Sequence, residues 1–331
     1  MSMPSSAAPK SSVGAVVIGR NEGERLASCL ASVLAAVDRV VYVDSGSVDG
    51  SAALAQKSGA ITVDLDPKTP FCAARARNAG FEALLAGSSR PEFVQFIDGD
   101  CELQRGWITK ATSFLRQNPG VAVVSGRRRE RFAERSVYNR LCDWEWDTPI
   151  GLAEACGGDA LMRTEAVNSV GGFNSDLIAG EEPELCVRLR AKGWQVWRLD
   201  TEMTLHDAAM TRFGQWWRRT RRAGHAYAEG AALHGHLPER HGVRGTARAL
   251  MWGLGVPATA LSLSMLHPAG LLVLLAWPFQ IVRLVARHGG GRIGWERSLF
   301  LLLGKIPEAI GVLEFVFGRL SNRRSSLIEY K

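Results

Sequence analysis

Short apolar runs alternate with amphipathic helical patterns over the first 125 residues of this 331-residue chain, and this alternation restricts the fold more than any other feature. The apolar runs have the length and the β-branched content of buried strands. They lie at residues 13–18, 39–43, 60–65, 92–97 and 121–125, and helical patterns at residues 24–37, 51–58, 73–86 and 107–117 separate them. Strands that alternate with helices in this way favour a parallel, doubly wound α/β sheet with right-handed crossovers.

The fourth apolar run ends at two carboxylates separated by one glycine, Asp98-Gly99-Asp100. Ligands of α/β proteins bind at the carboxyl ends of parallel strands, and two neighbouring carboxylates offer hard oxygen ligands to a divalent cation. Gly99 allows the backbone to turn there without a side chain in the way. Aspartate and glycine also form ordinary turns, so this motif by itself leaves both a turn and a metal site open.

Other predicted strands also end in polar residues. Arg20 and Glu22 follow the first strand, and Asp44 follows the second. Neither the glycine-rich dinucleotide fingerprint nor the phosphate-binding P-loop occurs in the sequence. We therefore expect the sheet to bind a nucleotide through carboxylates and a metal ion instead of a glycine-rich phosphate cradle.

The order and spacing of six motifs resemble those of the family 2 glycosyltransferases, which are inverting enzymes with the GT-A fold. The motifs are VVIGRNE (16–22), DSGSVDGS (44–51), ARNAG (76–80), FIDGD (96–100), GGF (171–173) and GEEPELCVRL (180–189). The resemblance covers roughly residues 12–206. It implies a Rossmann-like, mostly parallel sheet with flanking helices, and transfer of a sugar from a UDP- or GDP-sugar donor to a hydroxyl acceptor.

The resemblance also implies which residues bind the donor. Asp44 would hydrogen-bond the base, and Arg20 and Glu22 would line the nucleoside pocket. Arg77 would offset the charge of the diphosphate, although an arginine in this pattern is equally consistent with a helix surface. Asp98 would lie beside the ribose.

Metal and catalytic roles follow from the same resemblance. Asp100 would bind Mn²⁺ or Mg²⁺, and His206 matches a histidine that many GT-A enzymes place near the metal and diphosphate; a structural histidine is the other interpretation. Inversion needs a general base that deprotonates the acceptor. The family usually has Glu-Asp ahead of a helix, and here the pair is Glu181-Glu182. We assign Glu182 as the base, and Glu181 and Asp159 remain open.

The C-terminal third differs in composition. Residues 249–285 are almost free of charge, and they predict two short membrane spans or membrane-embedded helices that turn at His267-Pro268. Residues 299–320 are apolar but carry four charged residues, which suits an interfacial helix. A buried helical hairpin in a soluble domain is the alternative. Arginines precede and follow the hairpin, so the positive-inside rule places both of its ends in the cytoplasm.

These patterns predict six segments along the chain. They are a disordered leader (1–12), a nucleotide-sugar-binding half (13–125), an acceptor-binding and catalytic half (126–210), a basic amphipathic connector (211–245), a membrane hairpin (246–287) and an interfacial helix (298–320). The expected acceptor is a lipid or a lipid-linked saccharide at the cytoplasmic face of the cell membrane. The formal charge of +7 is moderate. We expect no nucleic-acid partner, and we interpret residues 127–131 as a solvated basic patch.

Two other classes of function remain open from the sequence. Sugar-phosphate nucleotidyltransferases also have acidic metal sites on α/β sheets, but they carry a lysine in the loop after the first strand, and residues 19–23 contain none. A non-catalytic membrane scaffold with a degenerate transferase domain is the second class. The presence of Asp44, Asp98 and Asp100 argues against such decay. The six cysteines lack metal-binding spacing and predict buried thiols in a reducing compartment.

Overall fold

The computed structural model describes residues 13–69, 71–87 and 89–321, so the predicted leader at residues 1–12 lies outside the described residues. The chain forms two compact units. The first contains the chain up to Ala133 together with Cys142–Asp176 and Glu181–Ala208, and it carries the sheet. The second contains Glu134–Leu141, Leu177–Gly180 and the chain from Ala209 onward, and it is helical.

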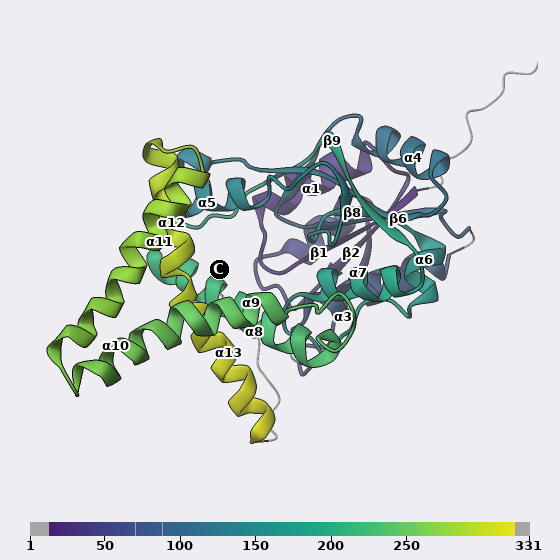
Figure 1. The fold of residues 1–331 in the computed structure, drawn as a ribbon. Helices are drawn as coiled ribbons and strands as arrows, with labels where there is room; N and C mark the ends of the chain where they lie inside the picture. The colour runs from purple at the N-terminus through teal and green to yellow at the C-terminus, as the bar shows by residue number, and fades with distance from the viewer. Residues whose placement is uncertain (1–12, 70, 88, 322–331) are drawn as a thin grey trace, which may run out of the picture. The chain divides into compact units, whose positions relative to one another are not determined.

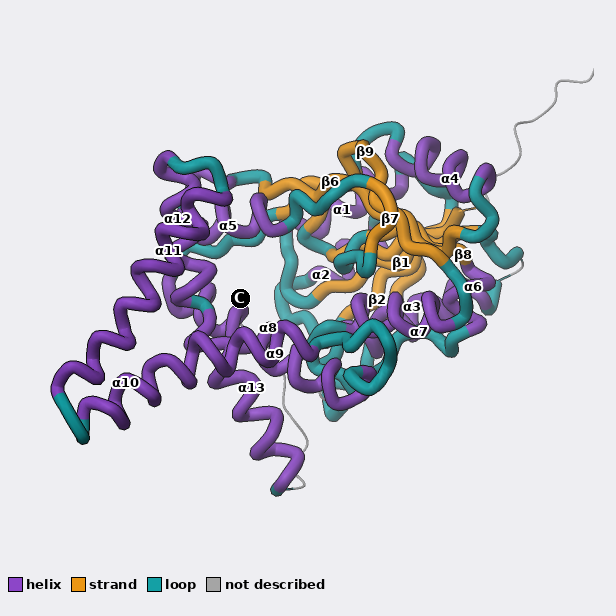
Figure 2. Tube along the Cα trace, in the orientation of Figure 1, coloured by secondary structure: helices purple, strands orange, loops and turns teal. Residues whose placement is uncertain are grey.

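A single mixed sheet forms the centre of the first unit (Figures 1 and 2). Its strands are β1 (Val13–Gly19), β2 (Arg39–Asp44), β3 (Ile61–Asp64), β4 (Phe93–Asp98), β5 (Cys101–Leu103), β6 (Val121–Glu130), β7 (Gly151–Ala153), β8 (Ala160–Arg163) and β9 (Gln195–His206). Their order is β3-β2-β1-β4-β8-β6-β9-β5, and β7 pairs with β9. The pairs among β3, β2, β1 and β4 are parallel. The five strands predicted before residue 126 are therefore present.

The second half of the sheet departs from the purely parallel arrangement. β8 is antiparallel to both β4 and β6, so β6 and its parallel partner β9 run in the same direction as β4. β5 and β7 pair with β9 in the antiparallel sense. Antiparallel strands do not need the helical crossover of a β-α-β unit, and the connection from β6 to β8 passes through β7 instead. Most strands still share one direction, as the sequence predicted.

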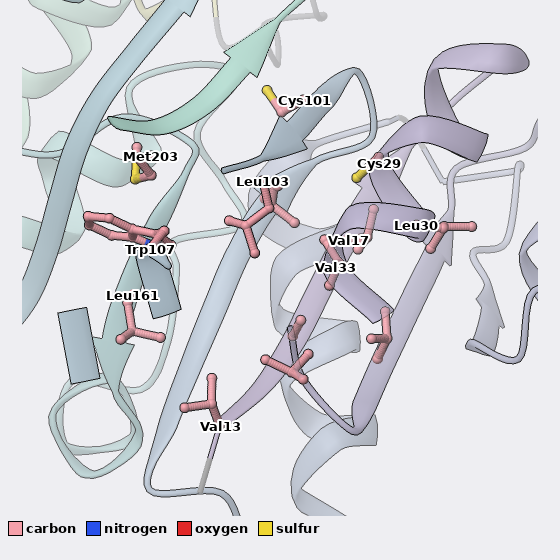
Figure 3. Packing of buried hydrophobic residues seen from close by; sticks show 14 of the residues in the cluster. Val13, Val17, Cys29, Leu30, Val33, Cys101, Leu103, Trp107, Leu161 and Met203 are labelled. Atoms are coloured by element: carbon pink, nitrogen blue, oxygen red, sulfur yellow. The ribbon is translucent and has the colours of Figure 1, made fainter. Parts of the chain in front are cut away.

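Helices cover both faces of this sheet. They are α1 (Glu24–Leu34), α2 (Ser51–Lys57), α3 (Ala73–Leu85), α4 (Trp107–Gln117), α6 (Thr164–Ser169) and α7 (Glu181–Ala191). β1 is buried throughout, with Ala15 and Val17 in one apolar cluster and Val16 and Ile18 in the other. Figure 3 shows the first cluster, where Trp107 lies near Leu161 and Met203. Burial on both faces explains the continuous apolar runs in the sequence.

β6 is longer than the strand predicted at residues 121–125. The strand continues to Glu130, and α5 (Val137–Glu145) follows after the short helix η1 (Ala133–Arg135). The residues of the predicted basic patch pair with β9 up to His206. Arg127 is 6 % exposed, so the interpretation of this patch as solvated was wrong for its first residues.

The second unit consists of a long helix and a series of shorter ones. They are α8 (Phe213–His234), α9 (Val243–Leu250), η2 (Met251–Gly255), α10 (Val256–Ser264), η3 (Pro268–Leu275), α11 (Ala276–Arg287), α12 (Gly291–Leu303) and α13 (Lys305–Leu320). α13 packs closely on α8 at Gly224 and Gly311, where an added Cβ would overlap a backbone oxygen of the other helix. The segment predicted as one interfacial helix at residues 298–320 contains parts of two helices, α12 and α13, which meet at Gly304.

Two arms of the second unit form an apolar hairpin, with α10 in one arm and η3 and α11 in the other (Figure 1). In the described part of the chain one helix, Pro268–Arg287, is long and apolar enough to cross a membrane, with a mean hydropathy of 1.9 over its most apolar window. Only 6 % of that window is buried. At the tip, Met265 and Leu266 are 83 % and 85 % exposed.

Candidate active site

The carboxyl ends of β1, β2 and β4 meet because these strands are parallel and in register. Gly19 lies beside Asp44, and Ile18 lies beside Asp98. Asp44 is buried, and its carboxylate accepts hydrogen bonds from the Tyr42 hydroxyl (2.9 Å) and from the backbone N–H groups of Gly46 (2.9 Å) and Ser47 (2.7 Å). Burial and the Asp44 charge raise the pKa of Tyr42, so its hydroxyl remains a donor. Asp44 is therefore a fixed acceptor at the strand edge.

The loop after β1 is tied to the loop after β2 by Asn21, a residue that the sequence did not single out. Its Oδ1 accepts a hydrogen bond from the backbone N–H of Val48 (2.8 Å), and its own N–H donates to the Ser47 hydroxyl (2.9 Å). Asn21 has a positive φ of 56°, which asparagine adopts more readily than most residues. Of the two residues predicted in this loop, Arg20 is exposed and Glu22 forms an ion pair with Arg25 (2.8 Å).

Arg77, on α3, is only 2 % exposed, so it is not a helix-surface arginine. Its Nη1 contacts Glu181 (2.8 Å), and its Nη2 contacts both Asp98 (2.9 Å) and Glu182 (2.9 Å). Burial lowers the pKa of Arg77, but these carboxylates outweigh that effect and raise it, so the guanidinium stays charged. One arginine thus joins the residue predicted beside the ribose to the predicted catalytic pair.

Two of the motifs are also joined next to Arg77. The side chain of Asn78 accepts a hydrogen bond from the backbone N–H of Phe173 (2.8 Å) and donates one to its carbonyl oxygen (2.8 Å). The guanidinium carbon of Arg77 lies 5.6 Å from the centre of the Phe173 ring. The ARNAG and GGF motifs therefore hold α3 against the loop that follows α6.

Asp98 is held between two arginines. Its Oδ1 pairs with Arg77 and its Oδ2 with Nη2 of Arg128 (2.8 Å), while its backbone N–H donates to Oδ1 of Asp159 (3.0 Å). Burial raises the pKa of the Asp98 carboxyl, but Arg77 and Arg128 outweigh burial and lower it. Asp98 is therefore ionised, and each of its oxygens already accepts a charge-assisted hydrogen bond.

Arg128 is the site residue that the sequence analysis missed. Its Nε contacts Oδ2 of Asp159 (2.9 Å), and its guanidinium carbon lies 5.2 Å from the centre of the Trp146 ring. A strand alternates its side chains between two faces, and in β6 Arg128 contacts Asp98 while its neighbour Arg129 pairs with Glu202. Burial does not alternate regularly along this part of β6, because the register shifts on both sides of Arg127, so no local pattern separates Arg128 from a solvated run of arginines.

Asp159, the alternative base, is fully occupied by hydrogen bonds. Besides Arg128 and the Asp98 backbone, its Oδ2 accepts the hydroxyl of Thr204 (2.7 Å), and its side chain has no exposed surface. A carboxylate that is enclosed in this way cannot reach an acceptor hydroxyl without breaking these bonds. The geometry therefore favours Glu182 over Asp159.

Asp100 and His206 lie side by side because β5 pairs with the end of β9. Oδ2 of Asp100 is 3.3 Å from Nε2 of His206, and Oε2 of Glu130 is 3.6 Å from Nδ1 of the same ring. Burial and the charge of Arg128 lower the pKa of His206, which favours the neutral imidazole that a metal ion requires. A carboxylate and a neutral imidazole, with a second carboxylate beside the other ring nitrogen, fit Mn²⁺ or Mg²⁺, and the imidazole suits Mn²⁺ better.

Glu181 and Glu182 begin α7, where the helix dipole favours negative charge. Glu181 is the more deeply buried and pairs with Nη1 of Arg77. The Glu182 side chain is 14 % exposed, and burial together with the charge of Glu181 raises its pKa to about 7. A partly accessible carboxylate with a pKa near neutrality can accept a proton from a hydroxyl group.

Comparisons with known proteins show similarities to glycosyltransferases. Residues 15–167 match the glycosyl transferase family 2 model. The succinoglycan biosynthesis protein ExoA of Rhizobium meliloti is 27 % identical over 184 residues, which are 52 % of this chain and 54 % of that protein. Glycosyltransferase AglE of Haloferax volcanii is 24 % identical over 202 residues, which are 56 % of this chain and 63 % of AglE. The chain therefore spans less than two thirds of the length of these relatives.

A solved structure covers nearly the whole chain. Mannosyltransferase PcManGT from Pyrobaculum calidifontis, in complex with GDP-Man and Mn²⁺, superposes with a TM-score of 0.62 at 17 % identity, over 96 % of this chain and 91 % of that one. At this identity the likeness concerns the fold alone. It confirms the GT-A-like fold that the sequence predicted.

Proposed function

We propose that this chain, whose residues 15–167 match the glycosyl transferase family 2 model, is a metal-dependent, inverting glycosyltransferase. Its donor is a UDP- or GDP-sugar, and its acceptor is a hydroxyl group of a lipid or lipid-linked saccharide at the cytoplasmic face of the membrane. The observation that carries the proposal is the contact chain from Asp100 and His206 through Trp146, Arg128, Asp98 and Arg77 to Glu182. It supports the proposal because it joins the two residues expected to bind a metal ion to a carboxylate of raised pKa.

The donor binds at the carboxyl edge of β1, β2 and β4. Asp44 offers a fixed acceptor to the base, and the loop tied by Asn21 forms the wall beside it. Asp98 accepts a ribose hydroxyl with the lone pairs that its two arginines leave open. Asp100 and His206 hold the metal ion, which when bound neutralises the charge on the diphosphate of the leaving nucleotide.

Glu182 acts as the general base. Its carboxylate removes the proton of the acceptor hydroxyl while the oxygen forms a bond to the anomeric carbon of the donor sugar. The bond between that carbon and the diphosphate breaks on the opposite face, and the nucleotide leaves with the electron pair. Arg77 orients Glu182 by holding Oε1 at 2.9 Å. The raised pKa of Glu182 increases its strength as a base at neutral pH.

The apolar hairpin supports the membrane part of the proposal. Its second arm, Pro268–Arg287, has the length and hydropathy of a span, and only 6 % of its most apolar window is buried. Such a surface is costly in water and is stabilised by a hydrocarbon environment. Arg244 and Arg248 precede the hairpin, and Arg283 and Arg287 lie at its far end. These charges suit anionic headgroups on the cytoplasmic side.

The test measures nucleotide release from a panel of UDP- and GDP-sugars with Mn²⁺ or Mg²⁺ and a membrane lipid extract. The structure of PcManGT holds GDP-Man and Mn²⁺, so this pair is tested first. We expect Asp100→Ala to abolish Mn²⁺-dependent nucleotide binding, and Asp38→Ala, which removes an exposed aspartate, to leave it unchanged. We expect Glu182→Gln to reduce transfer by about 10²-fold or more with donor binding retained. Unchanged nucleotide binding in Asp100→Ala would refute the metal site, and full turnover in Glu182→Gln would refute the base.

A further inference from the structure

The acidic groups at the active site form two neighbouring clusters that each have the composition of a cation site. One contains Asp100, Cys101 and His206, and the other contains Asp98, Cys101 and Asp159. In each cluster the three potential ligand atoms lie within 4.8 Å of one another. On composition alone, the two clusters could hold two neighbouring divalent cations at this edge of the sheet. The two clusters differ in what already lies inside them.

The second cluster is already filled by the guanidinium of Arg128. Its Nη2 lies 2.8 Å from Oδ2 of Asp98 and 3.2 Å from Sγ of Cys101, and its Nε lies 2.9 Å from Oδ2 of Asp159. Every ligand residue of the cluster therefore contacts this one cation. Burial lowers the pKa of Arg128, but the surrounding acids outweigh that effect and raise it, so the charge is permanent.

Two further contacts keep the guanidinium in place. Arg128 lies over the Trp146 ring, and that ring in turn packs edge-on against His206, with the ring centres 4.7 Å apart. The other oxygen of Asp98 is held by Arg77, so Asp98 cannot turn toward the first cluster without losing an ion pair. Asp98 therefore faces two arginines, and Asp100 is the member of the Asp-Gly-Asp motif that remains for a metal ion.

We propose that Arg128 is a specificity-determining residue that serves as a built-in cation and limits the site to one divalent ion, at Asp100 and His206. Its guanidinium occupies the second cluster sterically and repels a second divalent ion electrostatically. Removal of this side chain leaves two carboxylates and a thiol, which form a second site for a borderline metal such as Mn²⁺. The inference rests on the metal dependence proposed above, and it assigns a role to a residue outside the recognised motifs.

The experiment titrates the full chain with Mn²⁺ alone, by calorimetry and by electron paramagnetic resonance of the bound ion. We expect the wild-type chain to bind one ion. We expect Arg128→Ala to bind two, with a spectrum broadened by coupling between neighbouring Mn²⁺ ions. The matched control is Arg129→Ala, which removes the next arginine of β6, a half-exposed residue paired with Glu202. It is expected to keep one ion and an unbroadened spectrum.

A second variant covers the loss of packing in Arg128→Ala. Arg128→Met keeps an aliphatic stem over Trp146 and removes the charge together with the hydrogen-bond donors, so it is also expected to bind two ions. Adding Asp159→Asn to either variant is expected to return the stoichiometry to one. One ion in wild type and in both folded Arg128 variants would overturn this inference and leave the proposed function intact. No Mn²⁺ binding by the wild-type chain would overturn the metal dependence itself and the inference with it.

Discussion

The pKa of Glu182 offers a quantitative test of the active site, because two identified groups control it. Burial and the negative charge of Glu181 raise it to about 7. The base must be ionised to work, so the turnover rate is expected to rise with pH through this value and to reach a plateau above it. With a pKa of about 7, roughly one tenth of the molecules carry the ionised base at pH 6.

Glu181→Gln removes the charge that lies next to the base. Its loss lowers the pKa of Glu182 for two reasons: the repulsion between the carboxylates disappears, and Arg77 retains fewer competing partners. The acidic limb of the rate profile should therefore move to lower pH. Relative to its own plateau, the rate at pH 6 can rise by at most about tenfold, since only a tenth of the wild-type base is ionised there.

The assay follows nucleotide release from pH 5 to pH 9 at saturating donor and metal. Glu92→Gln is the control, because it removes an exposed carboxylate whose partner is Arg116 and should leave the limb in place. If the acidic limb of the rate profile does not move in Glu181→Gln, ionisation of Glu182 does not set that limb. A complete loss of activity in Glu181→Gln, with an active Glu182→Gln variant, would assign the base to Glu181.

Three further predictions concern the packing and the surfaces of the two units. Gly224→Val should lower the free energy of unfolding of the helical unit by about 1–3 kcal/mol, because the added side chain would collide with α13. Gly120→Ala is the control, because Gly120 has open space where its Cβ would lie. Urea unfolding followed by circular dichroism measures both variants, and equal stabilities would contradict the close packing. Arg77→Met leaves three carboxylates without their shared cation and should cost about 3 kcal/mol at pH 7. The loss of stability should be smaller at pH 5, because the carboxylates take up protons there. A urea midpoint that falls by the same amount at both pH values would refute an electrostatic origin. Leu272→Glu should weaken flotation of the protein with anionic vesicles. Val48→Glu, at a 92 % exposed position of the other unit, should leave flotation unchanged. Equal flotation of the two variants would argue against the hairpin as the membrane contact.

The sequence predicted the edge of the sheet well because its information is local. Each strand of this edge is marked in the sequence by its own apolar run and by the polar residue that follows it. The parallel register of the strands then brings Asp44 and Asp98 to one edge. The pairing of Asp100 with His206 was also accessible, since both were placed near the metal. These positions depend on secondary structure and strand direction, which short-range patterns encode.

The arginines could not be placed in the same way. For Arg77, a helix-surface position was as consistent with the sequence as a role at the diphosphate, because its helix gives no sign that α7 packs against it. Arg128 lies in a run of arginines that composition alone assigns to solvent, and its partners come from β4, β5 and the start of β8. Both assignments depend on contacts between residues far apart in the chain, which short-range patterns do not encode.

The three-way ion pair of Arg77 has a consequence for the order of events at the site. The same Nη2 contacts Asp98, on the side proposed for the donor, and Glu182, on the side proposed for the acceptor. Any ligand that draws the guanidinium toward one carboxylate weakens its hold on the other, so donor occupancy and the proton affinity of Glu182 are thermodynamically linked. By reciprocity, the donor affinity must depend on whether Glu182 carries a proton. Binding of the first substrate therefore sets the chemical state in which the second is received.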